Sequence, residues 1–476
     1  MVNENFSDMF VKRSLIPCDV NTLFDYHKQN GALERLVPPW SGLNVVSQKD
    51  GINNDAISIF RIEFGPIRLK WVSKHFGYIH NKQFQDKMIK GPFKKWVHTH
   101  SFIPQDENQC IIEDRINYTP KFGQIGSKIL HKNIQNYLNQ LFIYRYRILV
   151  DDINLKKRTV GKGKKILITG SHGLIGSALI PLLTNIGEHK VTRLARGSSN
   201  KIKDFPSNTD KQQEVIYWDL ESKKLNLREL ENFDIIIHLS GENIFGRWTN
   251  TKKRRILDSR VQSTILLSES LSKLSNPPSL LICASAIGYY GNRPNEILTE
   301  ESSSGDGFLS KVCQEWENAT KTATKAGIRV VNTRFGVVLC PKEGMLQKLL
   351  PPFKMGLGVS IGNKEHYINW VSIEDVIKSI FYLITDDSIH GPVNIVSPNL
   401  VTNMEFSNIL NKIFNPKLSI SINPKITKII FGQMADELLS TNSHVLPKKL
   451  LKKGYKFVNP DLEETVRFLV GKMQVE

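Results

Sequence analysis

The stretch Lys-Lys-Ile-Leu-Ile-Thr-Gly-Ser-His-Gly-Leu-Ile-Gly, residues 164–176, decides how most of this chain folds. A short apolar run, 166–168, leads into glycines at positions 170, 173 and 176, and an amphipathic stretch follows at once. Strand, tight turn and helix in this order are the context that a dinucleotide-binding fingerprint requires. A glycine turn in an α/β protein that binds nothing is the alternative interpretation.

Each glycine has a separate predicted task in such a turn. Gly170 allows the sharp turn, Gly173 lets the backbone approach a pyrophosphate, and Gly176 lets the helix pack closely on the strand. The phosphates would then bind free N–H groups at the positive end of the helix. The cofactor-binding residues predicted in this turn are Thr169, Gly170, Ser171, Gly173, Leu174, Ile175 and Gly176.

The second predicted strand, 190–196, indicates which dinucleotide binds. A site for NAD usually places an acidic residue near the end of this strand, where it binds the ribose hydroxyls. This strand instead offers Arg193 and Arg196, with no Asp or Glu nearby. Guanidinium groups suit a 2′-phosphate through paired, charge-assisted hydrogen bonds. We therefore expect NADP(H) rather than NAD(H), the alternative being surface arginines beside a loop.

Further apolar runs predict the remaining strands of a parallel sheet. They cover 215–220, 234–241, 280–291 and 329–339, and helical segments separate them. Ligands bind at the carboxyl edge of such sheets, so the residues at the strand ends are candidates. Those added to the predicted cofactor site are Asp219, Leu220, Leu239, Ser240 and Gly241. The segment from 164 onward is thus predicted to form a Rossmann-type, doubly wound α/β sheet.

Composition limits the class of protein. At 476 residues the chain is long enough for two or three domains, and its apolar share of 40% suffices for real cores. Five scattered cysteines without CxxC spacing predict a reducing compartment and neither disulfides nor a metal site. We see no signal peptide or membrane-length apolar run and expect a cytoplasmic protein without a transmembrane segment. The formal charge of +18 is spread along the chain, so we expect no nucleic-acid partner.

The first 150 residues have a different pattern. Strand-like segments at 56–64, 67–75, 95–103 and 109–118 precede one long helix-like segment at about 124–149. Strands followed by a helix predict an α+β unit, with an antiparallel sheet wrapped on that helix. His98 and His100 alternate on one strand face, and we interpret them as hydrogen-bonded strand histidines. No catalytic set is evident in this segment.

This first segment resembles the START-like, or polyketide-cyclase-like (SRPBCC), helix-grip family. The residues that carry the resemblance are 32–40, 91–100 and 113–115. The resemblance implies an apolar cavity between sheet and helix that holds a hydrophobic ligand. It leads us to expect that residues 1–150 fold alone and take up an apolar ligand.

The second part resembles the extended short-chain dehydrogenase/reductase superfamily of NAD-dependent epimerase/dehydratase type, and within it an atypical subgroup of epimerase-family proteins. Fusion to a START-like domain is an arrangement which that family shows. The resemblance covers about 164–475. Its motifs are 169–176, 238–241, 247–249, 259–264, 285–291, 308–309, 316–317, 333–339, 445–450 and 461–463.

The chain departs from the superfamily at the catalytic pair. Active members use Tyr-x-x-x-Lys, in which the tyrosine transfers a proton and the lysine lowers its pKa. Those two positions fall on Leu309 and Cys313 here, and the usual asparagine falls on Arg260, which we add to the cofactor site. The proton donor would then be another group or a water molecule. The candidate catalytic residues are Ser285, Tyr289, Tyr290 and Cys313, although Cys313 is equally interpreted as an inert buried residue.

These features predict four segments: a START-like domain at 1–150, a linker at 151–163, a dinucleotide-binding domain at 164–396 and a C-terminal substrate lobe at 397–476. Residues from about 340 would also contribute to that lobe. We expect an NADP(H)-binding oxidoreductase or epimerase-like protein whose partner is a small, possibly hydrophobic substrate. The alternative is a non-catalytic NADP(H)-binding regulatory or lipid-binding protein that acts through a partner, for example in cell division.

Overall fold

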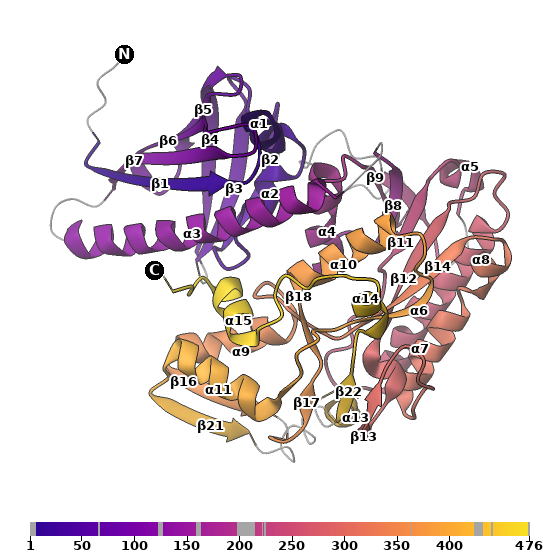
Figure 1. The fold of residues 1–476 in the computed structure, drawn as a ribbon. Helices are drawn as coiled ribbons and strands as arrows, with labels where there is room; N and C mark the ends of the chain where they lie inside the picture. Colours follow the sequence, from indigo (N-terminus) through magenta and orange to yellow (C-terminus); the bar gives the residue numbers. More distant parts are fainter. Residues whose placement is uncertain are drawn as a thin grey trace.

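The computed structural model describes residues 6–64, 67–121, 127–158, 163–197, 215–220, 222, 225–361, 363–422, 432–438 and 441–474. Figure 1 shows an antiparallel sheet with one long helix at the N-terminal end, and a parallel sheet flanked by helices. A smaller lobe is built from the C-terminal part of the chain. In the part of the chain that the structure describes, no helix combines the length and apolar character needed to cross a membrane.

The N-terminal domain is a seven-stranded antiparallel sheet in the order β1-β7-β6-β5-β4-β3-β2. Helix α3 (Ser127–Lys156) lies along this sheet, which confirms the helix-grip prediction (Figure 1). The strands β1, β2 and β5 were not predicted individually, because polar side chains fill many of their positions. The elements are β1 (Asp8–Ile16), α1 (Val20–Lys28), α2 (Ala32–Arg35), β2 (Leu43–Lys49), β3 (Ile57–Phe64), β4 (Ile67–Ile79), β5 (Gln83–Lys90), β6 (Phe93–Pro104) and β7 (Cys110–Pro120).

Helix α3 does not end where the sequence predicted. The predicted linker begins at 151, but the helix continues through its first six residues to Lys156. The polar, basic composition and the glycines of this segment favoured a linker, yet its first two residues bind cations: Asp151 pairs with Lys378 and Asp152 with Arg35. The predicted helix start and residues 159–162 of the predicted linker lie outside the described residues.

The second sheet has seven parallel strands in the order β10-β9-β8-β11-β12-β14-β19. This order confirms the doubly wound prediction, and it reverses between β8 and β11, which is where such sheets bind ligands. Its strands are β8 (Lys165–Thr169), β9 (Lys190–Arg196), β10 (Val215–Trp218), β11 (Ile235–His238), β12 (Leu280–Ala286), β14 (Arg329–Phe335) and β19 (Gly391–Ile395). Its helices are α4 (Leu174–Asn185), α5 (Leu227–Leu230), α6 (Asn250–Leu271), α7 (Phe308–Asn318), α8 (Lys321–Lys325) and α10 (Ile373–Thr385).

The remaining elements form short sheets and the smaller lobe. In one of these sheets, β13 (Arg293–Leu298) pairs with β22 (Ser443–Val445), which joins the segment after β12 to the C-terminal part. The others are η3 (Ile287–Tyr290), β15 (Val337–Leu339), α9 (Gly344–Lys354), β16 (Leu357–Ile361), β17 (Tyr367–Ile368), β18 (Trp370–Ser372), β20 (Val401–Thr402), α11 (Asn403–Phe414), β21 (Leu418–Ile422), α13 (Gln433–Leu438), α14 (Lys448–Lys452) and α15 (Leu462–Val470).

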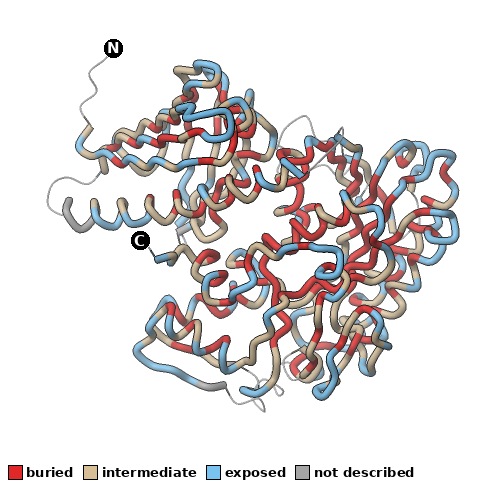
Figure 2. The backbone as a smooth tube through the Cα atoms, viewed as in Figure 1, coloured by how far each residue is buried: buried red, intermediate tan, exposed pale blue. Residues whose placement is uncertain are grey.

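The N-terminal domain and the parallel-sheet domain share one apolar core. Buried side chains of α1, α3, α4, α10 and α15 belong to a single contact cluster, with Leu23, Ile153, Leu179, Ile380 and Phe468 among them. Figure 2 shows buried backbone running from the C-terminal half of α3 into the body of the parallel sheet. Apolar surface that is removed from water stabilises the folded state in proportion to its area, so this contact resists separation of the domains.

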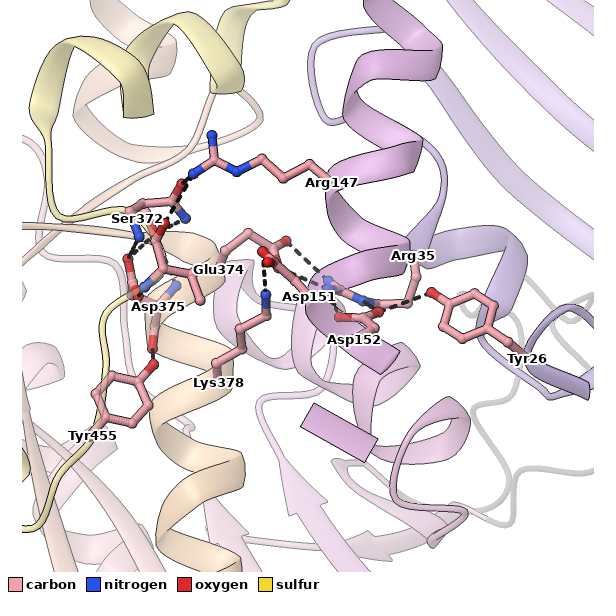
Figure 3. A network of polar contacts seen from close by, with 12 residues as sticks. Tyr26, Arg35, Arg147, Asp151, Asp152, Ser372, Glu374, Asp375, Lys378 and Tyr455 are labelled. Carbon is pink, nitrogen blue, oxygen red and sulfur yellow. Dashed lines mark hydrogen bonds and ion pairs between the residues drawn. The ribbon is translucent and has the colours of Figure 1, made fainter. Parts of the chain in front are cut away.

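A buried charge cluster lies inside this contact (Figure 3). The Arg35 guanidinium, with 4% of its side chain exposed, donates to Asp152 of α3 at 2.8 and 2.9 Å and to Glu374 of α10 at 2.9 and 3.0 Å. The Tyr26 hydroxyl donates to Asp152 at 3.0 Å. Burial alone would raise the pKa of the Glu374 carboxyl, but Arg35 outweighs it and holds that pKa below its usual value.

Further along α3, Arg147 donates to the Asn459 side chain at 2.7 Å and to the Val458 carbonyl at 3.0 Å (Figure 3). The Asp375 carboxylate of α10 in turn accepts from the Val458 N–H at 2.7 Å. Helix α3 is therefore bonded to α10 and to the segment before α15, and it belongs to both halves of the molecule.

Candidate functional site

The glycine turn has the geometry that the sequence predicted. Gly170 has φ +67°, and a Cβ there would stand 2.7 Å from the Leu239 carbonyl carbon. A Cβ at Gly176 would stand 2.4 Å from the Gly170 oxygen, so only glycine lets α4 pack this closely. No side chain caps α4 at Gly173, which leaves the N–H groups of its first turn for another acceptor. An uncapped helix start at the reversal of a parallel sheet has the geometry in which helices bind anions.

Thr169 connects this turn to the neighbouring strand β11. Its hydroxyl oxygen accepts from the N–H groups of Leu239 and Ser240 at 3.1 and 3.3 Å. With both lone pairs used, its proton is directed at His238 Nδ1, 2.7 Å away. The other His238 nitrogen then carries the proton and donates to Ser263 of α6 at 3.1 Å. This chain of bonds holds the ends of β8 and β11 together behind the glycine turn.

The predicted 2′-phosphate residues lie on β9, Arg193 in its middle and Arg196 at its end. Arg193 Nη1 lies 3.3 Å from His172 Nε2 of the glycine turn, and partial burial lowers the pKa of both groups. Arg196 is exposed at the carboxyl end of β9, next to Trp218 on β10. Asp219 follows β10 directly and accepts from the Ser222 hydroxyl at 2.6 Å. Residues 198–214, which continue from β9, lie outside the described residues.

Arg260 completes this edge from helix α6. A Cβ at Gly241 would stand 3.1 Å from its guanidinium carbon, so the two residues are in contact. The guanidinium donates to the Glu242 carbonyl at 3.0 Å and lies 5.1 Å from the centre of the Trp316 ring. The predicted cofactor residues from β8, β9, β11 and α6 thus surround the carboxyl edge where the strand order reverses.

The predicted catalytic residue Ser285, near the end of β12, belongs to a buried charge network. Its hydroxyl donates to Glu317 of α7 at 2.7 Å. Both oxygens of Glu317 also accept from Arg334 of β14, each at 2.8 Å. Sequence analysis noted the motifs that contain Glu317 and Arg334 but assigned them no role. The available signal was an arginine near the end of a predicted strand of the parallel sheet, which when buried requires a counterion.

The two tyrosines of η3 have different environments. The Tyr290 side chain is fully buried; its hydroxyl lies 2.9 Å from the Thr299 carbonyl and 2.8 Å from Asn394 Oδ1, and accepts from Arg334 at 2.8 Å. Burial raises the pKa of this hydroxyl to about 12. The Tyr289 ring is half-buried and lies 3.5 Å from the Arg334 guanidinium carbon. Tyr290 therefore has no bonding capacity left for a substrate, whereas Tyr289 keeps partial exposure.

The positions of the missing catalytic pair face the same loop. A Cβ at Gly288 would stand 3.2 Å from Leu309 Cβ and 3.9 Å from Cys313 Sγ, so α7 packs directly against η3. Cys313 is buried, and burial raises the pKa of its thiol to about 11. At neutral pH the thiol is therefore protonated and is not a nucleophile.

A cavity of about 520 Å³ opens beside this loop, with residues of η3, α7 and the C-terminal lobe in its wall. The charged residues in its wall are Arg293, Asp306, Asp436 and Glu437, and Leu309 contributes an apolar surface. Glu437 of α13 accepts from the first two N–H groups of α7, those of Phe308 and Leu309, at 3.1 and 2.8 Å. The C-terminal lobe thereby caps the helix that carries the altered catalytic positions.

Three family models match the chain. They are the NAD dependent epimerase/dehydratase family at residues 166–395, a domain of unknown function (DUF1731) at 425–469, and the polyketide cyclase/dehydrase and lipid transport family at 16–141. Epimerase family protein Mb2239 of Mycobacterium bovis is 34% identical over 304 residues, which are 64% of this chain and 96% of that protein. The chain belongs to the epimerase family. A Bacillus subtilis member, YfhF, is 31% identical over 307 residues, 64% of this chain and 98% of that protein.

Two solved structures are similar to this epimerase-family chain over different lengths. A protein described as a nucleoside-diphosphate sugar epimerase from Corynebacterium glutamicum is 30% identical, has a TM-score of 0.79, and aligns over 98% of this chain and 91% of its own. Its likeness therefore includes the N-terminal domain. Human epimerase family protein SDR39U1, solved with NADPH, is 28% identical with a TM-score of 0.58, and aligns over 65% of this chain and all of its own.

Proposed function

We propose that this epimerase-family chain binds NADP(H) at the β8–α4 turn and uses it in oxidoreductase or epimerase-like chemistry on a small molecule. The observation that carries the proposal is the uncapped start of α4 at the sheet reversal, with Arg193 beside it. The human relative that was solved with NADPH supports the choice of nucleotide. Family membership supports NAD(P)-linked chemistry in general.

The residues present fit such a cofactor. The pyrophosphate would bind the N–H groups of the first turn of α4, where side chains at Gly170 or Gly176 would collide with backbone. Arg193 and Arg196 would pair with the 2′-phosphate, and Asp219 and Leu220 would border the adenine. Leu239, Ser240, Gly241 and Arg260 would line the path toward the nicotinamide, which supplies or accepts a hydride when bound.

The substrate would occupy the cavity beside η3 and α7. Ser285 does not line this cavity, but it lies at the strand end that leads into η3. There Glu317 fixes the direction of the serine proton and leaves the oxygen to accept from a substrate hydroxyl, which makes Ser285 the candidate for a substrate contact. Tyr289 is the candidate proton donor, since it keeps partial exposure next to Arg334. We assign no proton transfer to Tyr290 or Cys313. The Tyr290 hydroxyl is buried and already bonded, and the Cys313 thiol is buried, with a pKa that burial raises to about 11, which makes it a weak acid.

Calorimetric titration of the full-length protein with NADPH and NADH tests the cofactor. We expect NADPH to bind about 10- to 100-fold more tightly, since hydrogen bonds to a charged group contribute about 1.5–3 kcal/mol. Arg193→Ala should remove most of this preference. Arg228→Ala, which changes an exposed arginine away from the site, should not. Equal affinities in the unchanged protein would contradict the NADP(H) assignment.

A non-catalytic NADP(H)-binding protein is the second candidate, favoured by Leu309 and Cys313 at the positions of the catalytic pair. A screen of NADPH oxidation against carbonyl and enone compounds separates the two functions. Turnover supports the enzyme. Tight NADPH binding without turnover across the screen would support the binding protein.

A further inference from the structure

A row of ionisable side chains crosses the inner face of the N-terminal sheet. Asp86 on β5 lies opposite His98 on β6, and His100 lies opposite Asp114 on β7. Side chains two residues apart on a strand share a face, so His98 and His100 point the same way. That face is turned toward α3, because the His98 ring contacts the Phe142 ring of that helix at 5.8 Å.

Three of these residues place donor atoms around one point. Asp86, His98 and His100 each offer one ligand atom, and the three atoms lie within 4.8 Å of one another. Asp86 Oδ2 lies 3.6 Å from His98 Nδ1 and 3.9 Å from His100 Nε2. These distances exceed those of a hydrogen bond, but they are close to the separation of about 3.3 Å expected between donors around a tetrahedral zinc ion.

Asp114 contacts the opposite nitrogen of each histidine. Its Oδ1 binds His98 Nε2 at 2.9 Å and lies 2.7 Å from His100 Nδ1, the latter in a bent geometry. A carboxylate that receives one ring N–H leaves the other nitrogen as a free lone pair, and this is the common support of metal-binding histidines. In both rings the nitrogen left over is the one nearer Asp86. The sequence predicted hydrogen-bonded strand histidines, and this holds for His98, whereas His100 Nδ1 contacts the same oxygen outside hydrogen-bond geometry. The second nitrogens of the two rings converge.

The charges around this point suit a dication. Metal-binding histidines must be neutral, and His98 and His100 are both buried, where a charged ring is disfavoured. The two carboxylates of Asp86 and Asp114 contribute two negative charges. Arg145 of α3 lies close enough to interact with both carboxylates, and its cation offsets one of them. A bound dication would leave a net charge of about +1, which a hydroxide or an anionic ligand atom can neutralise.

We propose that Asp86, His98 and His100 bind one divalent transition-metal ion of the zinc class inside the N-terminal domain, with Asp114 as the positioning carboxylate. Two imidazoles and one carboxylate are a donor set that Zn²⁺ and related ions accept, with at least one further position for water or a ligand oxygen. The site would give this domain a Lewis acid facing its interior. The proposal is independent of the cofactor site in the parallel sheet.

The test uses the full-length protein without a polyhistidine tag, after removal of metal by a chelator. We expect Co²⁺ to produce the visible ligand-field bands of a low-coordinate histidine site at about one equivalent, and Zn²⁺ to displace it. Added Zn²⁺ should also raise the melting temperature, because a ligand that binds only the folded state stabilises it. A folded wild-type protein that gives no such bands and no saturable Zn²⁺ binding would overturn the proposal.

Variants assign the ligands. His98→Gln with His100→Gln should abolish the bands, Asp86→Asn should weaken Co²⁺ binding, and Asp114→Asn should weaken it by about 10- to 100-fold through the lost support. His131→Gln, a partly exposed histidine on α3, is the matched control and should bind as the wild type does. Circular dichroism shows whether the double variant is folded. If it is unfolded, the Co²⁺ titration of Asp86→Asn tests the site instead. Unchanged binding in folded Asp86→Asn, or in the folded double variant, would overturn the site.

Discussion

Glu317 and Arg334 give neighbouring residues of the candidate site different functions. The pair orients the Ser285 hydroxyl on one side and fills the bonding capacity of Tyr290 on the other. Ser285 lies near the end of β12 and Tyr290 follows that strand in η3, so their positions in the sequence alone do not separate a substrate contact from a structural contact. Their substitutions should therefore change different measured quantities.

We expect Ser285→Ala to lower turnover of any substrate found in the screen by about 10²-fold or more. Its free energy of unfolding should change little. Tyr290→Phe should do the opposite. It removes the hydroxyl that bonds Arg334 Nη1 and Asn394 Oδ1, which costs about 1–3 kcal/mol, while kcat per folded molecule stays near that of the wild type. Urea unfolding and steady-state kinetics on both variants check this. Equal losses of turnover would show that Tyr290 contacts the substrate.

His238 should make stability depend on pH. Burial lowers the pKa of this histidine to about 4, and its Nδ1 accepts from Thr169, so protonation breaks that bond. Because the unfolded chain titrates near 6.5, it binds the proton first as pH falls; the stabilisation is complete above pH 6.5 and is lost progressively toward pH 4. The loss should reach about 3 kcal/mol. Urea unfolding at pH values from 7 to 4 should therefore show that the free energy of unfolding falls less in His238→Gln than in the wild type or in His131→Gln.

At the scale of elements, α7 depends on a cap from far along the chain. The residue before it, Gly307, has φ +104° and no side chain to cap the helix, and Glu437 of α13 supplies the acceptors instead. We expect Glu437→Ala to cost about 0.5–2 kcal/mol, as losses of helix N-caps do. Glu315→Ala, an acidic residue farther along the same helix, is the control. Thermal unfolding compares them, and equal melting temperatures would mean that water replaces Glu437 without loss.

At the scale of the whole molecule, the START-like domain is built into the rest of the chain. The sequence predicted that residues 1–150 fold alone, but such a fragment lacks both carboxylates that bind the buried Arg35. A fragment of residues 1–158 would keep Asp152, although it would still lack Glu374. We therefore expect the first fragment to be less stable than the second, and both to be less stable than the same domain within the full chain.

Arg35→Met in the full chain should cost about 3–5 kcal/mol, because it leaves Asp152 and Glu374 buried without a counterion. Adding Asp152→Asn and Glu374→Gln should recover most of this loss, since the unpaired charges are then gone. Arg13→Met breaks an ion pair whose arginine is 68% exposed and should cost no more than about 1 kcal/mol. Denaturant unfolding measures all three. If Arg35→Met lowered the free energy of unfolding by no more than Arg13→Met does, the role of this cluster would be contradicted.

The sequence by itself determined the features that local geometry dictates. Gly170 and Gly176 predicted a turn that other residues cannot adopt, and the apolar run before them predicted a buried strand. The strand that carries Arg193 and Arg196 was also predicted with its bounds, because its apolar pattern is local. The spacing of apolar residues likewise predicted strands and helices, since a buried strand face repeats every two residues and a helix face about every three to four. The order of these elements along the chain then predicted the two types of sheet.

Only the tertiary structure decided which charged groups meet. Arg35 and Glu374 are 339 positions apart, and Glu437 lies 128 positions after the N–H of Leu309 that it caps. The sequence contains each residue, but a pattern of hydrophobicity records which face is buried and not which partner is buried with it. For this reason Asp151 and Asp152 were assigned to a polar linker, and His98 and His100 were interpreted as ordinary hydrogen-bonded strand residues. Burial makes a pairing obligatory, and the packing of distant elements selects the partner.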